Sequence, residues 1–159
     1  MKAAQATEFD AIIVGGGMVG ASLACLLENT PLRLALVDQT AFDVDAIPYF
    51  QQRSMADGAS ANQPGFDPRV SAITAASKNL FVGMGIWNEI ERTRCCAYQD
   101  MEVWDADGTG SIHFSAADIN QAELGSIVEN SLVSAALYNK LASSTTLEIL
   151  APLAVESLD

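Results

Sequence analysis

The sequence predicts an α/β fold that begins with a strand–helix–strand unit whose strands run parallel. The apolar run Ala11-Ile12-Ile13-Val14 is short, partly β-branched and followed by glycine, which is typical of a buried parallel strand. Residues 18–27 are rich in helix-forming side chains and apolar on several faces, so we expect a helix largely buried against a sheet. The apolar run Leu34-Ala35-Leu36-Val37 predicts the second strand.

The turn between the first strand and the helix reads Gly15-Gly16-Gly17-Met18-Val19-Gly20. The first glycine of this G-x-G-x-x-G pattern permits a tight turn, the second lets a pyrophosphate approach the backbone, and the third lets the helix pack closely against the strand. Phosphates are expected at the helix N-terminus, where unpaired N–H groups and the helix dipole favour an anion. The pattern predicts dinucleotide binding at Gly15, Gly17, Met18, Val19 and Gly20, and by itself it fits FAD and NAD equally.

An acidic residue, Asp38, ends the second strand about 20 residues after the glycines, where dinucleotide-binding folds carry a ribose-binding acid. Its carboxylate is expected to accept hydrogen bonds from the ribose hydroxyls of the adenosine half. An acid here also argues against a ribose 2′-phosphate and therefore against NADP in this site. The glycines could be ordinary turn residues, but the flanking strands, helix and acid favour the dinucleotide interpretation.

The composition is that of a globular protein. The chain has 159 residues, half of them hydrophobic, and a formal net charge of −12, which repels nucleic-acid phosphates and anionic lipid headgroups. No apolar run is long enough for a transmembrane helix, and residues 1–8 carry an acid and lack the apolar region of a signal peptide. We therefore expect no nucleic-acid partner and no transmembrane segment.

The cysteines and the single histidine give no support for a metal site or a catalytic triad. Cys25 lies in the first helix and is expected to be a small core residue. Cys95 and Cys96 are adjacent and form no metal-ligand spacing, so reduced thiols in a cytoplasmic setting are expected. His113 has no accompanying ligand and is interpreted as a residue on one face of a strand. No metal-ligating and no catalytic side chain is predicted.

The remainder of the chain alternates between strands, helices and polar connections. Trp87 and Ile90 are expected to be packing residues, and Arg69, which follows a proline on an extended segment, is a candidate phosphate clamp. Residues 115–125 are interpreted as a polar link. The predicted elements are a surface loop over 40–65, an extended segment over 66–74, a helix over 74–84, a β-hairpin over 100–114, a helix over 131–141 and a strand over 147–150.

Five stretches, in this order, resemble the N-terminal part of the UbiH/UbiF/VisC family of FAD-dependent aromatic-ring hydroxylases, which act in ubiquinone biosynthesis. Together they span nearly the whole chain outside residues 40–65, and they are far more specific than the glycine pattern alone. They are Asp10-Ala11-Ile12-Ile13-Val14-Gly15-Gly16-Gly17-Met18-Val19-Gly20, Phe66-Asp67-Pro68-Arg69-Val70-Ser71-Ala72-Ile73, Gly85-Ile86-Trp87, Met101-Glu102-Val103-Trp104-Asp105 and Leu124-Gly125-Ser126-Ile127-Val128-Glu129-Asn130.

The resemblance implies a Rossmann-like FAD-binding core of the glutathione-reductase type, with a small β-hairpin piece of a substrate domain. It implies FAD at the glycine turn, Arg69 near the flavin phosphate and ribityl region, and Asn130 at the start of the helix beside the flavin. It assigns residues 1–85 to a first FAD-binding segment, 86–124 to part of a substrate domain whose sheet roofs the substrate site, and 125–159 to a second, truncated FAD-binding segment.

The activity implied by the resemblance is hydroxylation of an aromatic ring of a ubiquinone precursor, with NAD(P)H as reductant and O₂ as oxygen source. The family's later flavin motifs are missing, so we expect an N-terminal fragment that turns over no substrate alone and leaves a strand edge and helix faces without partners. A homo-oligomer and a ubiquinone-pathway complex are both compatible with the resemblance. The expected location is the cytoplasm, with peripheral contact to the inner membrane implied by the lipophilic substrates.

Two other hypotheses stay open at this point. The chain could belong to another FAD or NAD oxidoreductase that shares only the βαβ unit, in which case the agreement at Arg69, Trp87 and residues 103–105 would be accidental. It could also be a non-catalytic nucleotide-binding module that is complete at 159 residues. Whether the neighbours of the third parallel strand are filled distinguishes the non-catalytic module from the other two hypotheses.

Overall fold

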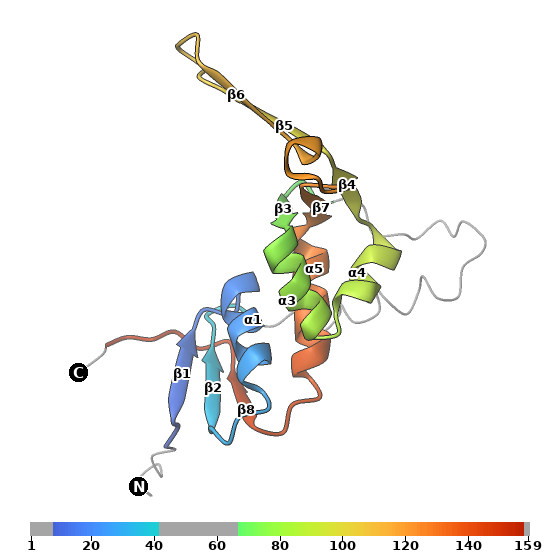
Figure 1. Ribbon diagram of the computed structural model, residues 1–159. Helices are drawn as coiled ribbons and strands as arrows, with labels where there is room; N and C mark the ends of the chain where they lie inside the picture. The colour runs from blue at the N-terminus through green and yellow to red at the C-terminus, as the bar shows by residue number, and fades with distance from the viewer. Residues whose placement is uncertain (1–7, 42–66, 158–159) are drawn as a thin grey trace, which may run out of the picture. The chain divides into compact units, whose positions relative to one another are not determined.

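The computed structural model of the protein describes residues 8–41 and 67–157 (Figure 1). The chain divides into two compact units, of which unit 1 comprises Met1–Gln52 with Ser134–Asp159 and unit 2 comprises Arg53–Val133. This division concerns packing alone, so the predicted assignment of segments to FAD binding and substrate binding stays a prediction. The predicted surface loop over 40–65 lies outside the described residues, except for residues 40 and 41.

Unit 1 contains the strand–helix–strand unit that the sequence predicts. Strands β1 (Ala11–Val14) and β2 (Leu34–Val37) pair in parallel, and β8 (Leu147–Leu150) pairs in parallel with the other edge of β2, in the order β1-β2-β8. All of β2 is buried, as expected for the central strand of a parallel sheet. The three predicted strands are therefore confirmed with their boundaries.

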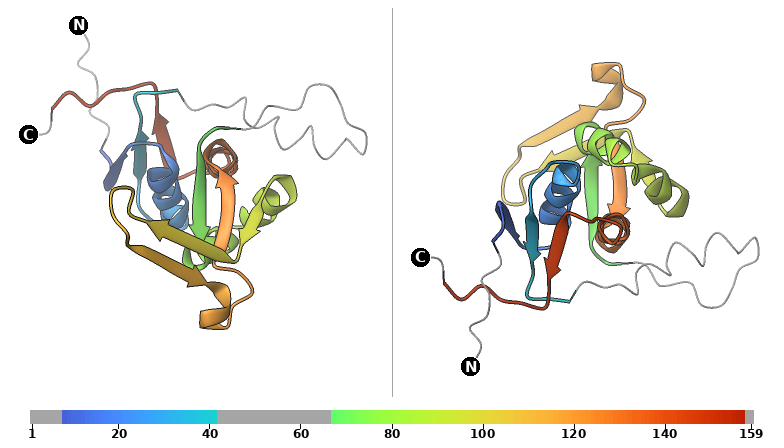
Figure 2. Two further views of the ribbon diagram at one scale, coloured as in Figure 1. Left: turned by 90° about the horizontal axis from the view of Figure 1, so that it is seen from above. Right: turned by 90° about the horizontal axis from the view of Figure 1, so that it is seen from below.

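Two helices lie on the same face of this sheet (Figure 2): α1 (Met18–Leu27) and the second half of α5 (Asn130–Leu141). The two helices also contact each other. The Cys25 thiol lies 4.0 Å from the Leu137 carbonyl oxygen, and Lys140 forms a 3.0 Å ion pair with Glu28, beyond the end of α1. Cys25 is buried, which confirms the predicted core role.

The expected burial of the first strand and first helix is only half right. Only one side of α1 is buried, at Ala21, Ala24 and Cys25, whereas Val19 on its outer side is 86% exposed. Side chains alternate along β1, so Ile13 faces α1 while its neighbours, including Val14 at 63% exposed, point to the other face. Strand β1 also pairs with β2 alone among the described strands, so its other edge has no strand partner there. The expected strand edge and helix face without partners are thus confirmed for the described residues.

Unit 2 is built on an antiparallel sheet. Its order is β3-β7-β4, with β3 at Val70–Thr74, β7 at Gly125–Glu129 and β4 at Cys96–Tyr98. The helices α3 (Ala75–Gly83) and α4 (Trp87–Thr93) follow β3 in the chain and contact each other. Apolar side chains from all these elements except β4 form its core, among them Ile73, Phe81, Trp87, Ile90 and Val128. The burial of Trp87 and Ile90 confirms their predicted packing role.

The predicted β-hairpin is present, with β5 at Asp100–Trp104 and β6 at Ser111–Ser115. Its register sets Met101 opposite Phe114 and Val103 opposite Ile112, so one face of the hairpin is apolar. His113 lies on the opposite face, 3.3 Å from the Asp100 carboxylate and largely exposed, in agreement with its interpretation as a strand residue.

The sequence analysis missed several elements of unit 2. Strand β4, helix α4 and strand β7 are not among the predicted elements. The polar link over 115–125 contains a 3₁₀ helix, η2 (Ala116–Ile119), whose first residue is buried. Among the described residues, no helix has the length and apolar character needed to cross a membrane.

Candidate dinucleotide-binding site

The glycine turn of unit 1 has the geometry that its sequence predicts. Gly15 has a φ of +101°, a conformation that side-chain-bearing residues rarely adopt, so it provides the tight turn out of β1. Gly20 packs so closely that an added Cβ would collide with the Gly15 carbonyl oxygen and crowd the Ile13 side chain. Its predicted role in helix–strand packing is therefore confirmed. A Cβ added at Gly17 would meet open space, which suits a position reserved for a ligand.

The peptide units around Gly16 are held from two sides. The Gly16 N–H donates a 2.6 Å hydrogen bond to one carboxylate oxygen of Asp38, and the Gly16 carbonyl accepts a 2.6 Å hydrogen bond from the Tyr138 hydroxyl. The second Asp38 oxygen accepts from the Thr40 N–H at 2.7 Å. These two N–H donors, Thr40 first and Gly16 second, hold the pKa of Asp38 below its usual value, because they stabilise the ionised form.

The N-terminus of α1 is open to a ligand. Gly17 is its N-cap residue, so no side chain caps the helix there, and its first turn contains no acid. The unpaired N–H groups of this turn and the positive end of the helix dipole therefore remain available to an anion. A depression of about 620 Å³ lies against this end of the helix, lined by residues 12–15, 17–20 and 23.

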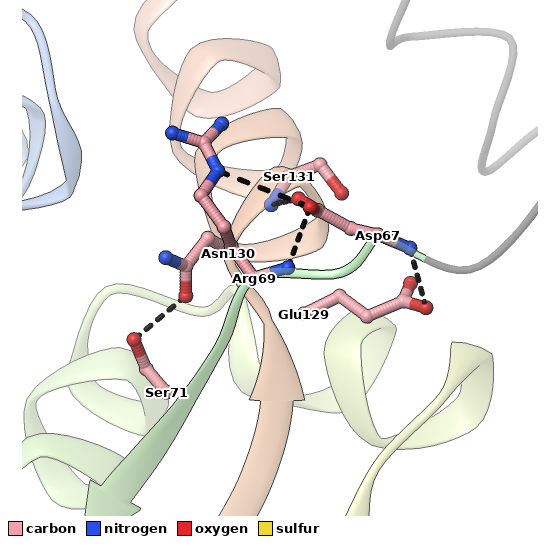
Figure 3. Close-up of polar contacts among 6 residues, drawn as sticks. All are labelled: Asp67, Arg69, Ser71, Glu129, Asn130 and Ser131. Carbon is pink, nitrogen blue, oxygen red and sulfur yellow. Dashed lines mark hydrogen bonds and ion pairs between the residues drawn. The ribbon is translucent and has the colours of Figure 1, made fainter.

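The second group of predicted site residues lies in unit 2, where β3 and α5 begin (Figure 3). The Asp67 carboxylate accepts a 2.9 Å hydrogen bond from the Arg69 N–H and a 3.1 Å hydrogen bond from the Ser131 N–H. It therefore closes a turn at the start of β3 and also satisfies an N–H group in the first turn of α5. The same donors, with Arg69 first, keep the pKa of Asp67 below its usual value.

Asn130 is held against the same turn. Its N–H donates a 3.0 Å hydrogen bond to the Arg69 carbonyl, and its side-chain oxygen accepts a 2.6 Å hydrogen bond from the Ser71 hydroxyl. The Arg69 side chain itself is 81% exposed, and only its Nε approaches the Asp67 carboxylate, at 3.9 Å. Figure 3 shows the two terminal guanidinium nitrogens pointing away from Asp67. Arg69 thus has a fixed backbone and an exposed, chemically available fork.

An ion pair between a buried carboxylate and a partly exposed arginine supports this turn. Glu129, the last residue of β7, accepts a 3.2 Å hydrogen bond from the Asp67 N–H and forms a 3.0 Å ion pair with Arg94. The Glu129 side chain is only 7% exposed, so its charge depends on these partners. The start of β3, the end of β7 and the residue after α4 are therefore tied together.

The structure gathers the predicted residues into two groups. Gly15, Gly17, Met18, Val19, Gly20 and Asp38 lie together in unit 1, whereas Arg69 and Asn130 lie together in unit 2. Sequence reasoning missed two residues of these groups, Tyr138 and Asp67. Tyr138 gave no signal, because its partner lies 122 positions away. The Asp-Pro-Arg order around Asp67 is typical of a side-chain-capped turn and could have revealed it.

The fold is that of FAD-dependent monooxygenases. Over 96% of the chain it matches the crystal structure of pqsL, a probable FAD-dependent monooxygenase from Pseudomonas aeruginosa, with a TM-score of 0.64, 19% identity and 35% of that chain covered. It also matches the flavin-dependent monooxygenase PieE in complex with FAD and substrate, with a TM-score of 0.59 and 13% identity over 92% of this chain and 24% of that one. At these identities the likeness concerns the fold alone.

Relatives in sequence narrow the resemblance to ubiquinone-biosynthesis hydroxylases. The chain is 38% identical over 129 residues to 3-demethoxyubiquinol 3-hydroxylase of Escherichia coli strain K12. The aligned stretch makes up 81% of this chain and 29% of that enzyme. It is 35% identical over 133 residues to the mitochondrial ubiquinone biosynthesis monooxygenase COQ6 of Danio rerio, covering 84% of this chain and 25% of that enzyme. The resemblance predicted from the sequence is thus confirmed. The chain spans less than a third of the length of these relatives, and no protein-family model matches it.

Proposed function

We propose that this chain binds FAD and that it acts within a flavin-dependent monooxygenase of the relatives' full length. The reaction would hydroxylate an aromatic ring of a ubiquinone precursor of the 2-polyprenylphenol or benzoquinol type, with NAD(P)H as reductant and O₂ as oxygen source. One observation carries the cofactor part of the proposal. The glycine turn is fixed through Gly16 by Asp38 and Tyr138, while the N-terminus of α1 behind Gly17 stays open.

The residues present fit the cofactor. A pyrophosphate needs N–H donors and space, and the turn offers both, since a Cβ at Gly17 would meet no atom and the first turn of α1 carries no acid. Asp38 uses one lone pair on each oxygen for Gly16 and Thr40, so each oxygen keeps capacity to accept from a ribose hydroxyl. When bound, the flavin would supply the redox and oxygen chemistry of the hydroxylation.

The chain's own residues would bind and orient the cofactor. Met18 and Val19 would donate their N–H groups to the phosphates, Arg69 would place its guanidinium fork near the phosphate and ribityl region, and Asn130 would lie beside the flavin. This arrangement corresponds to a Rossmann-like core of the glutathione-reductase type. No described side chain is assigned a proton-transfer role. The whole protein is proposed to act in the cytoplasm, peripherally at the inner membrane, where its lipophilic substrates reside.

Cofactor retention tests the first part of the proposal. The purified chain is mixed with FAD, desalted, and examined by visible absorption, with NAD⁺ as a competing ligand and the Gly17→Val variant as the control. We expect flavin bands to remain with the unsubstituted chain, to resist NAD⁺, and to be lost in the variant, whose side chain fills the space reserved for the phosphates.

Two results would contradict the proposal. Flavin retained equally by the Gly17→Val variant would show that FAD binds elsewhere, and displacement of FAD by NAD⁺ would favour a nicotinamide dinucleotide in the glycine turn. The hydroxylation itself is tested on a protein of the relatives' length, by NAD(P)H- and O₂-dependent conversion of a polyprenylphenol. Oxidation of NAD(P)H without a hydroxylated product would overturn the proposed substrate class.

A further inference from the structure

We infer that Asp67 is a positioning residue for Arg69, through which it sets the affinity for the pyrophosphate of the bound dinucleotide. The inference rests on the proposed function, because it concerns how the guanidinium fork is presented to the cofactor. Neither the glycine pattern nor the arginine itself requires an acid at this position. The Asp67 carboxylate contacts two segments of unit 2, the start of β3 and the start of α5 (Figure 3).

Hydrogen bonds hold the backbone of Arg69 at both its N–H and its carbonyl group. Asp67 accepts from the Arg69 N–H at 2.9 Å, while the Arg69 carbonyl accepts from the Asn130 N–H at 3.0 Å. Asp67 also accepts from the Ser131 N–H at 3.1 Å, so the same carboxylate reaches the first turn of α5. Both peptide groups of Arg69 are therefore fixed relative to the start of α5.

Only the Nε atom of the Arg69 guanidinium approaches Asp67, at 3.9 Å, and the two terminal nitrogens point away from it. A carboxylate at this place restrains the rotation of the long side chain and leaves its fork available for a bidentate contact with a phosphate. Less rotamer freedom is then lost when the phosphate binds.

At the N-terminus of α5, the Asp67 carboxylate already accepts a hydrogen bond from an N–H group of the first turn, whereas no side chain caps α1 at Gly17. Of these two helix ends in the described part of the chain, the first holds an internal anion and the second remains available for the ligand. Arg69, and not the N-terminus of α5, is thus the cationic group that this turn presents.

For the substitution Asp67→Asn, the inference predicts a change in FAD affinity opposite in sign to the change that net charge alone would cause. The chain has a net charge of −12, so removal of one carboxylate should by itself favour an anionic ligand. If Asp67 positions Arg69, the substitution Asp67→Asn weakens FAD binding instead. The expected loss is roughly two- to fivefold, the scale of an exposed ion pair.

The experiment measures the dissociation constant of FAD by flavin fluorescence, together with the thermal unfolding midpoint, for Asp67→Asn and Asp67→Ser. Asparagine and serine cap helices and turns about as well as aspartate, so folding should be retained while the charge is lost. Asp105→Asn is the matched control, because Asp105 closes a similar turn by accepting from the Asp107 N–H at 3.1 Å. We expect both Asp67 variants to lose a little stability, because the Arg69 and Ser131 N–H groups stabilise the carboxylate, but to remain folded at the temperature of the titration. At that temperature both variants, and not the control, should bind FAD more weakly.

A double-mutant cycle with Arg69→Ala completes the test. If Asp67 acts through Arg69, the Asp67→Asn substitution has no effect on FAD affinity once the arginine is gone. Unchanged or tighter FAD binding by Asp67→Asn, or an equal loss in the Arg69→Ala background, would overturn the inference. Failure of the unsubstituted chain to bind FAD would instead overturn the proposed function.

Discussion

The Tyr138 hydroxyl donates a 2.6 Å hydrogen bond to the Gly16 carbonyl, so a residue of α5 fixes the glycine turn 122 positions earlier in the chain. The Asp38 carboxylate accepts a hydrogen bond from the N–H group of Gly16 as well. The turn that would receive the phosphates is therefore shaped by two side chains that need not touch the ligand themselves.

The substitution Tyr138→Phe removes this hydrogen bond while the ring is kept. We expect FAD affinity to fall roughly fivefold, since a neutral hydrogen bond contributes about 1 kcal/mol and the loss falls on the turn that binds the phosphates. Titration of FAD against the variant measures the effect. Tyr98→Phe, which removes a hydroxyl from β4 in unit 2, serves as the control and should leave the affinity unchanged.

Gly17 and Gly20 should respond differently to the same substitution. Gly20→Ala places a methyl group against the Gly15 carbonyl, so we expect a loss of about 1–3 kcal/mol in the free energy of unfolding. Gly17→Ala meets open space at a φ of −64° and should fold normally, yet it should bind FAD more weakly. Urea denaturation and FAD titration of both variants separate the two roles. Equal stability of the two would contradict the close packing at Gly20.

The pH dependence of stability should contain a contribution from Asp38. The Thr40 and Gly16 N–H groups hold its pKa in the folded protein below 3.8, the value for an unperturbed aspartate. The carboxylate therefore stabilises the fold above pH 3.8, and this contribution is lost as the pH falls through the lower, folded-state pKa. We expect Asp38→Asn to be less stable than the unsubstituted protein at pH 7 and to lose less stability on acidification. Urea denaturation between pH 7 and pH 3 checks this, and parallel curves for the two proteins would rule it out.

The ion pair between Arg94 and Glu129 should be important for the stability of unit 2. Because Glu129 is almost completely buried, Arg94→Ala leaves a buried charge with one partner fewer, and we expect a loss of roughly 3 kcal/mol in the free energy of unfolding. Arg92→Ala removes the same kind of side chain from an exposed position on α4 and should change stability by less than about 0.5 kcal/mol. A comparable loss of unfolding free energy in both variants would show that the effect of Arg94→Ala does not come from its ion pair with Glu129.

The elements that the sequence predicts correctly are those whose signal is local. Strands β1, β2 and β8 are short apolar runs, and the hairpin has a glycine-containing turn between alternating strands. Strand β7 lacks such a signal because its buried residues include Ser126 and Glu129. A buried glutamate reads as a surface residue until its partner Arg94 is known, and that partner comes from a distant part of the chain.

The residues of the candidate site likewise fall into those with a local sequence signal and those that depend on distant parts of the chain. The glycines and Asp38 follow a spacing that a single βαβ unit imposes, so one stretch of sequence suffices to find them. The supporting residues Tyr138 and Asp67 act through backbone groups, at Gly16 and at Arg69 and Ser131. Such contacts depend on tertiary structure and leave little trace in residue type.

The position of β8 has a consequence for the order of folding. Strand β2 ends at Val37, and its neighbour β8 begins only at Leu147, after the whole of unit 2. During synthesis unit 2 is complete before β8 leaves the ribosome, and until then β1 and β2 form only a two-stranded ribbon, which is marginal in water. Closing so long a connection adds little entropy cost over a medium one but slows the search for the contact. We therefore expect unit 2 to mature first, and a released chain truncated before Leu147 to retain a folded unit 2 and an unfinished unit 1.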